Sequence, residues 1–122
     1  MNHHYKKGKL YEKRAAAWLT VQGYEILEQN FRCMLGEIDL IARENGELVF
    51  VEVKYRSNHM TGTPEEAVTL NKKRHISNTA LFYLKTHGKN IFTACRFDVI
   101  CIDDTGCRLY QNAFEYCGTF RI

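Results

Sequence analysis

Two short motifs in this chain contain the residue types that bind divalent cations. Asp39 lies in one apolar run, and Glu52 and Lys54 lie in the next. The dipeptide Asn45-Gly46 separates the two runs and is typical of a two-residue hairpin turn, because a type I′ turn needs positive φ at both central residues. We therefore expect the runs over residues 36–43 and 47–55 to be antiparallel strands of one hairpin.

The expected register places acidic residues opposite one another. If Asn-Gly forms the whole turn, Asp39 lies opposite Glu52 and Glu37 lies opposite Lys54, and all four side chains point to one face. Directly opposed Cβ atoms are about 5 Å apart. Two carboxylates at that separation suit a shared cation with oxygen ligands such as Mg²⁺. Without a cation they would repel each other.

The apolar positions of the hairpin indicate that this charge pair is partly desolvated. One face is expected to be buried, and it consists of Ile38, Leu40, Ala42, Val49, Val51 and Val53. Ile41 and Phe50 add apolar side chains to the charged face. Desolvation strengthens the binding of an ion and raises the cost of an unpaired acid. The alternative is a surface hairpin with a cross-strand Glu37–Lys54 ion pair.

Two predicted helices flank the hairpin and carry further charged residues. The period of residues 9–22 predicts a helix that places Glu12 beside its apolar stripe, although Glu12 could instead pair with Lys9 or Lys13 on an exposed face. Thr63-Pro64 predicts the start of a second helix that runs to about residue 86. Its Lys72 falls on an apolar stripe, from which it could reach the carboxylates, a phosphate or solvent.

The remaining elements complete a sheet of four or five strands. We expect strands at residues 24–32, 96–102 and 107–111 in addition to the hairpin, and a loop at residues 56–63 that could close over a substrate. Asp98 lies within one of these strands, and we expect it to be structural, bonded to nearby backbone or to Arg96. The prediction is an α/β fold with a mixed sheet flanked by helices.

Composition restricts the class of protein. The 122 residues, 45% of them hydrophobic and 25% charged, predict one globular domain over residues 1–122. The sequence has no apolar run long enough for a membrane span or a signal peptide, so we expect a cytoplasmic protein. Five cysteines without a Cys-x-x-Cys pair predict free thiols. The net charge is +3, and candidate phosphate contacts are Lys9, Lys13, Arg56, Lys72, Lys73 and Arg74.

In this order and spacing, the motifs resemble those of the YraN-like family over nearly the whole chain. They are Gly8 and Glu12 in a first helix, Gly36-Glu37-Ile38-Asp39, Val51-Glu52-Val53-Lys54, Lys72 in the later helix and Arg96-Phe97-Asp98. That family looks like a branch of the restriction-endonuclease-like PD-(D/E)XK nucleases and is similar in motif order to archaeal Holliday-junction resolvases.

The resemblance implies an αβββαβ core and metal-dependent hydrolysis of DNA. Asp39 and Glu52 would bind Mg²⁺ or Mn²⁺, Glu12 would complete the site, and Lys54 would be the catalytic lysine. Glu37 and Lys72 match further family positions. Two departures are Ile38, which replaces the proline of the superfamily's name, and Tyr55, which follows Lys54 where the family is expected to have a small hydroxyl residue.

Three functions remain open from the sequence. The first is an endonuclease for branched or structured DNA, which would act as a homodimer by analogy because two symmetric cuts call for two sites. The second is a nucleic-acid-binding or partner-recruiting module that keeps the fold with little catalysis. The third is a scaffold whose acidic pair binds a structural cation, for which Lys54 would be an unhelpful charge.

Overall fold

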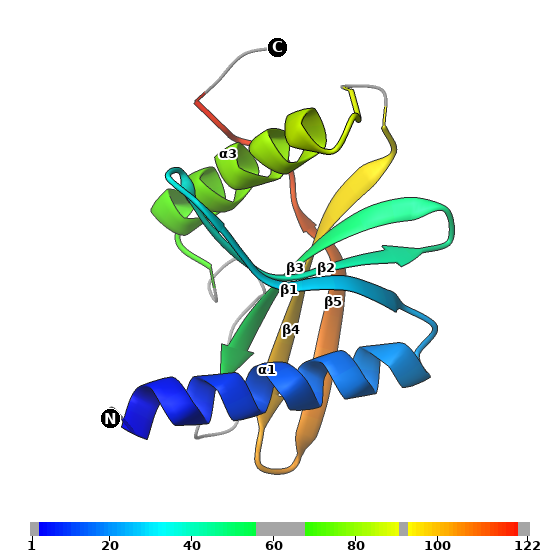
Figure 1. Cartoon of the computed structure of the whole chain (residues 1–122). Helices are drawn as coiled ribbons and strands as arrows, with labels where there is room; N and C mark the ends of the chain where they lie inside the picture. Colours follow the sequence, from blue (N-terminus) through cyan, green and yellow to red (C-terminus); the bar gives the residue numbers. More distant parts are fainter. Residues whose placement is uncertain (1–2, 56–67, 91–92, 120–122) are drawn as a thin grey trace.

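The structure is a computed structural model that describes residues 3–55, 68–90 and 93–119, with side chains from Gly8 onward. The elements in chain order are α1 (His3–Val21), β1 (Glu25–Cys33), β2 (Gly36–Glu44), β3 (Glu47–Tyr55), α3 (Leu70–Thr86), β4 (Cys95–Asp103) and β5 (Gly106–Phe114) (Figure 1). This order confirms the predicted αβββαβ core, and β5 contains the further strand expected at residues 107–111.

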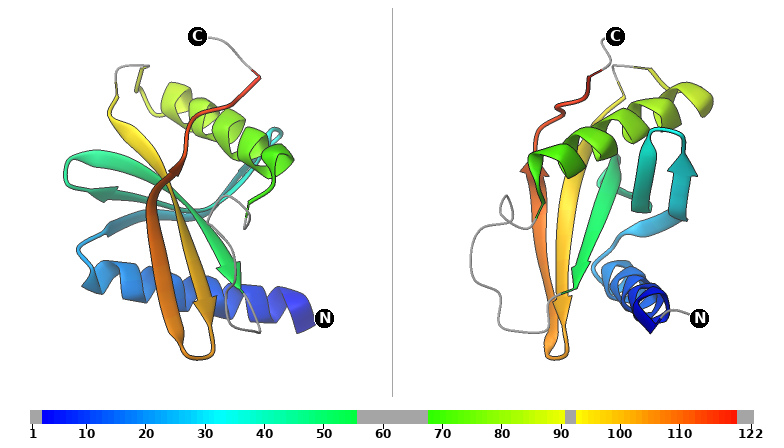
Figure 2. Two further views of the ribbon diagram at one scale, coloured as in Figure 1. Left: turned by 180° about the vertical axis from the view of Figure 1, so that it is seen from behind. Right: turned by 90° about the vertical axis from the view of Figure 1, so that its left-hand side faces the viewer.

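The five strands form one mixed sheet in the order β1-β2-β3-β4-β5. Of these strands, β3 and β4 run parallel, and the other neighbours are antiparallel. The parallel pair is the one whose connection contains α3, as expected because parallel neighbours need a crossover. The helices α1 and α3 lie on opposite faces of the sheet (Figure 2), which confirms the predicted α/β class.

Each helix covers its own hydrophobic cluster. Phe50 of β3 packs in the cluster under α3, whereas Val49 and Val51 pack in the cluster under α1. Both faces of the central part of the hairpin are therefore covered. The acids at its open end, the end away from the Asn45-Gly46 turn, lie next to both hydrophobic clusters. Among the described residues, no helix has the length and apolarity required to cross a bilayer. All five cysteines are free thiols, as predicted.

The later helix begins further along the chain than predicted. α3 starts at Leu70, and its N-cap is Thr69, whose hydroxyl accepts a hydrogen bond from the Lys72 amide at 3.2 Å. The predicted start at Thr63-Pro64 lies outside the described residues, as does the loop at residues 56–63. A threonine hydroxyl at the N-cap satisfies one of the free amides of the first turn, and Thr69 has this role for α3.

The Asn-Gly turn of the hairpin is confirmed. Asn45 and Gly46 both have positive φ, 55° and 77°, and the flanking residues Glu44 and Glu47 pair. The β2–β3 ladder then continues in the predicted register as far as Leu40 and Val51. Beyond that pair the two strands part, and β2 continues with β1 alone toward a second turn.

The departing strand changes the face on which its side chains pack. Leu40 packs under α1, but Ile38, two residues earlier, packs under α3. In a regular strand two residues of the same parity share a face. The prediction that Ile38 would lie with Leu40 and Ala42 is therefore wrong, and the change of face occurs at Asp39.

Candidate functional site

Asp39 lies where β2 leaves β3, and its side chain bonds to the backbone of β3. In a continued ladder the Val53 amide would donate to the carbonyl of Ile38, because alternate antiparallel pairs exchange backbone hydrogen bonds. It donates instead to Asp39 Oδ2 at 2.8 Å. The carboxylate thus replaces a missing backbone acceptor and is held at the point of divergence.

Glu52 is the second acid of the site, and it is almost completely buried. Its exposed fraction is 4%, and its carboxyl group hydrogen-bonds to that of Asp39. Burial, followed by the hydrogen bond and the negative charge of Glu52, raises the pKa of Asp39 well above its usual range. The predicted proximity of Asp39 and Glu52 is therefore present, although it occurs one step beyond the last ladder pair.

Lys72 supplies a positive charge to this pair. Its Nζ lies 3.7 Å from Glu52 Oε2, and its side chain is 40% exposed. Of the destinations that the sequence left open for Lys72, the carboxylate cluster is the one observed. Lys54 has a different position. It is half-buried, and its backbone is the ladder partner of Cys101 in β4. Its side chain forms no ion pair with the described residues.

Glu12 of α1 approaches the acids from the opposite helix. Its Oε1 atom is buried and has no hydrogen-bond partner. Burial, together with the negative charge of Asp39, raises the pKa of Glu12. Glu12 therefore lies beside the site as predicted, and Lys9, the partner named in the alternative, also lies close enough to act on its carboxylate.

A polar cavity of about 200 Å³ lies beside Asp39. Its lining residues come from α1, β1 and β2 and are Gly8, Lys9, Glu12, Asn30, Arg32, Glu37 and Asp39. Arg32 Nε pairs with Glu37 Oε1 at 3.2 Å. The predicted pairing of Glu37 with Lys54 is wrong, because the β2–β3 ladder has ended and Glu37 pairs with Arg32 of β1.

Basic side chains surround these acids. Lys9 faces Glu12, Arg32 faces Glu37 and Lys72 faces Glu52. Of the other predicted phosphate contacts, Lys13 and Arg74 are exposed, Lys73 lies over the Phe114 ring at 5.6 Å, and Arg56 lies outside the described residues. Each of the three described acids Glu12, Glu37 and Glu52 thus has a basic side chain beside it.

The chain that carries these residues matches a described protein family. Residues 11–102 match the family described as "Uncharacterised protein family UPF0102". The chain belongs to the UPF0102 family. A UPF0102 protein of Lachnoclostridium phytofermentans is 52% identical over 113 residues, which cover 93% of this chain and 96% of the relative. A UPF0102 protein of Syntrophus aciditrophicus is 47% identical over 119 residues, covering 94% and 93%.

The donor set of this UPF0102 chain fits a divalent cation in its chemistry. A buried carboxylate oxygen without a donor, on Glu12, faces a cavity shared with Asp39, and a cation would satisfy both. As placed in the described part of the chain, no three His, Cys, Asp or Glu side chains converge closely enough to hold an ion. The acidic side chains of the site, as placed, therefore do not by themselves form a complete set of ligands for a divalent cation.

Asn30 was not identified from the sequence as a residue of the site. It lines the polar cavity, its backbone has positive φ (56°), and its Oδ1 atom is buried without a hydrogen-bond partner. The only sequence signal is an asparagine inside a predicted strand, where asparagine is disfavoured.

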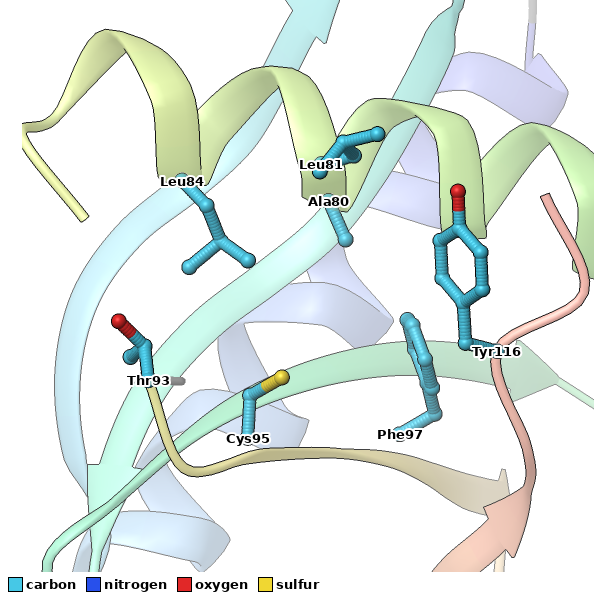
Figure 3. A pocket seen from close by; sticks show the side chains of 7 residues that line it. All are labelled: Ala80, Leu81, Leu84, Thr93, Cys95, Phe97 and Tyr116. Carbon is cyan, nitrogen blue, oxygen red and sulfur yellow. The ribbon is translucent and has the colours of Figure 1, made fainter. Parts of the chain in front are cut away.

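A second, more apolar cavity of the UPF0102 chain is separate from this chemistry. It has a volume of about 270 Å³ and is lined by Ala80, Leu81, Leu84, Thr93, Cys95, Phe97 and Tyr116 (Figure 3). No acidic side chain is among these lining residues. Burial raises the pKa of the Cys95 thiol, which lowers its reactivity.

Proposed function

We propose that this UPF0102 protein is a divalent-metal-dependent endonuclease that hydrolyses phosphodiester bonds in branched or otherwise structured DNA and acts in the cytoplasm. The observation that carries the proposal is the buried pair of carboxyl groups of Asp39 and Glu52, beside a cavity into which Glu12 brings a buried oxygen without a donor. Desolvated like charges are costly, and they persist most often where function requires them.

The acids have distinct tasks in this proposal. Asp39 and Glu52 would hold Mg²⁺ or Mn²⁺, with Glu12 opposite them on α1. A bound ion supplies positive charge for a phosphoryl group and lowers the pKa of a water molecule. The hydrogen bond from Val53 fixes Asp39, so the protein does not have to order this carboxylate when a ligand arrives.

The two lysines also have distinct tasks. Lys72 is partly exposed and pairs with Glu52 at 3.7 Å, from which it can turn to a substrate phosphate. Lys54 projects from β3 two residues beyond Glu52 and is not neutralised by a described carboxylate. Its ammonium group is therefore available to stabilise the negative charge that develops on a phosphoryl oxygen.

A cleavage assay tests the proposal. Purified protein is incubated with linear, flap and four-way-junction DNA in Mg²⁺ or Mn²⁺, together with D39N, E52Q and K54A. We expect metal-dependent cleavage that each substitution lowers about a hundredfold or more. E25Q is the matched control, because Glu25 lies on β1 in an exposed ion pair with Arg43. Equal cleavage by wild type and D39N would contradict the proposal.

A nucleic-acid-binding module on the same fold is the second candidate. It is favoured by one observation, namely that no three acidic ligands converge in the described residues. In that case the protein would bind the same DNA tightly without cleaving it, and D39N would not change the affinity. Sedimentation with and without junction DNA would test the homodimer that symmetric cleavage requires.

A further inference from the structure

Asn30 occupies an irregular position in the β1–β2 ladder. Gln29 pairs with Leu40 and Phe31 pairs with Ile38, so Asn30 lies opposite Asp39, but these two residues do not form a ladder pair. Asn30 has φ 56°, in the left-handed region, which is rare in a strand and which asparagine tolerates better than most residues.

This conformation is coupled to the change of face at Asp39. Phe31 and Ile38 pack under α3, while Leu40, on the other side of the irregular pair, packs under α1. A left-handed residue allows β1 to make the same change at the same place. The side chain of Asn30 is thereby directed into the polar cavity that it shares with Glu12 and Asp39.

The amide oxygen of Asn30 lacks a partner inside this cavity. Asn30 Oδ1 and Glu12 Oε1 are both buried acceptors without a hydrogen bond. Buried acceptors without donors are rare and each costs about 1–3 kcal/mol. Two of them facing one small cavity beside Asp39 indicate a missing positive group rather than two independent defects.

A neutral oxygen is also the ligand that the site lacks. The cavity and its border already contain Glu12, Glu37, Asp39 and Glu52, so another carboxylate would increase the repulsion. Mg²⁺ and Mn²⁺ accept amide and carbonyl oxygens together with carboxylates. Asn30 supplies such an oxygen without additional charge.

We propose that Asn30 Oδ1 is a further ligand of the divalent cation at this site, together with Asp39 and the carboxylate of Glu12. The inference rests on the proposed function for the presence of the cation. It assigns a role to a residue that neither acidic motif contains, and it explains why a strained asparagine lies opposite the central aspartate.

The test compares two glycine substitutions in otherwise intact protein. N30G removes the side chain and keeps a backbone that favours positive φ. N112G is the matched control, because Asn112 has φ 51° in β5, far along the sheet from β1. Mn²⁺ binding is measured by calorimetry without DNA, and urea unfolding is measured in EDTA.

We expect N30G to bind Mn²⁺ about tenfold more weakly than wild type, in the range seen when groups around a metal are removed. N112G should bind as wild type does. Both variants should remain folded in EDTA, because glycine adopts left-handed backbone without strain, and N30G additionally loses only the hydrogen bond to Glu12. An N30G affinity within twofold of wild type would overturn the inference.

A second variant separates a cation ligand from a residue that merely positions Glu12, to which the Asn30 side chain also hydrogen-bonds. N30D keeps an oxygen at the same place and adds charge, so as a ligand it should bind Mn²⁺ at least as tightly as wild type. If the role of Asn30 were only to hold Glu12 through its amide group, the new carboxylate would repel Glu12, and weaker binding would overturn the inference.

The outcomes also distinguish this inference from the proposed function. If wild-type protein binds Mn²⁺ and cleaves DNA, and N30G does both equally well, only the role of Asn30 fails. If wild-type protein binds no Mn²⁺ at millimolar concentration, the cation site and the ligand role fail together.

Discussion

The two ends of the β2–β3 hairpin both carry acids, but their cations differ. The cation at the turn end is largely buried and close to every acid, whereas the cation at the open end is partly exposed and, among the described acids, pairs only with Glu52. At the turn end, Arg96 pairs with Glu44 at 2.7 Å, with Glu47 at 2.8 Å and with Asp98 at 3.0 Å. Asp98 is completely buried and also accepts a hydrogen bond from Tyr24 at 2.7 Å. Every charge in this cluster has a close partner.

The open end is the opposite case. Asp39 and Glu52 are buried against each other, and the nearest described cation is Lys72 at 3.7 Å from Glu52. Glu12 adds a buried oxygen without a donor. The acids of the turn end are therefore structural, whereas those of the open end are the ones that would hold a divalent cation under the proposed function.

The largest expected effect is at the turn end. Arg96→Met leaves three carboxylates without their cation, and breaking a buried ion pair costs about 3–5 kcal/mol of unfolding free energy. Urea denaturation measures the loss. Arg43→Met is the control, because the Arg43–Glu25 pair is exposed and should contribute less than about 1 kcal/mol. Equal losses in the two variants would remove the distinction between the two ends.

The same substitution should have opposite signs at the two ends. In EDTA, Asp39→Asn removes a desolvated like charge and keeps an acceptor for the Val53 amide, so the unfolding free energy should rise by about 1–3 kcal/mol. Asp98→Asn should lower it, since Arg96 loses a buried partner. A loss of stability in Asp39→Asn would contradict our interpretation of the open end.

The stability of the metal-free protein should depend on pH through Asp39. Its pKa in the folded state is raised above the unfolded value of about 3.9, so the folded state binds more protons between those values. The stability of wild type relative to Asp39→Asn should therefore fall as pH rises from about 4 toward neutrality. Urea midpoints at pH 5 and pH 8 measure this fall, and saturating Mg²⁺ should abolish it.

The smallest effect is expected for Lys72. Lys72→Met removes a partly exposed pair and should cost less than about 1 kcal/mol of stability. If Lys72 contacts a phosphate, DNA affinity should fall severalfold and the salt dependence should decrease by about one ion. Lys85→Met, an exposed position in the last turn of α3, is the control. An unchanged salt dependence would limit Lys72 to its contact with Glu52.

The sequence predicted the parts of the site that depend on local geometry. The Asn45-Gly46 turn determines the register of the hairpin, so Asp39 could be placed near Glu52 without the structure. Asp98 could be recognised as structural because Arg96 lies two residues before it and therefore on the same face.

The parts that could not be predicted depend on contacts between distant segments. The ladder ends at Leu40, and beyond it the start of β2 packs directly on α3: a Cβ atom on Gly36 would lie 2.9 Å from Thr79 Oγ1. In this part of β2, Glu37 pairs with Arg32 rather than with Lys54. No local pattern indicates where two antiparallel strands will part.

The hydrogen bond from the Val53 amide to Asp39 Oδ2 makes the backbone of β3 a direct reporter of the site. The proton shift of an amide follows the charge of the oxygen that accepts from it, so the Val53 resonance should move when Asp39 loses its proton or meets a cation. A nitrogen-15 spectrum of isotope-labelled protein would thus follow occupancy at one atom without substrate or mutation. It also shows why alanine at position 39 is a poor probe, because it would silence the signal and leave the strand without its acceptor.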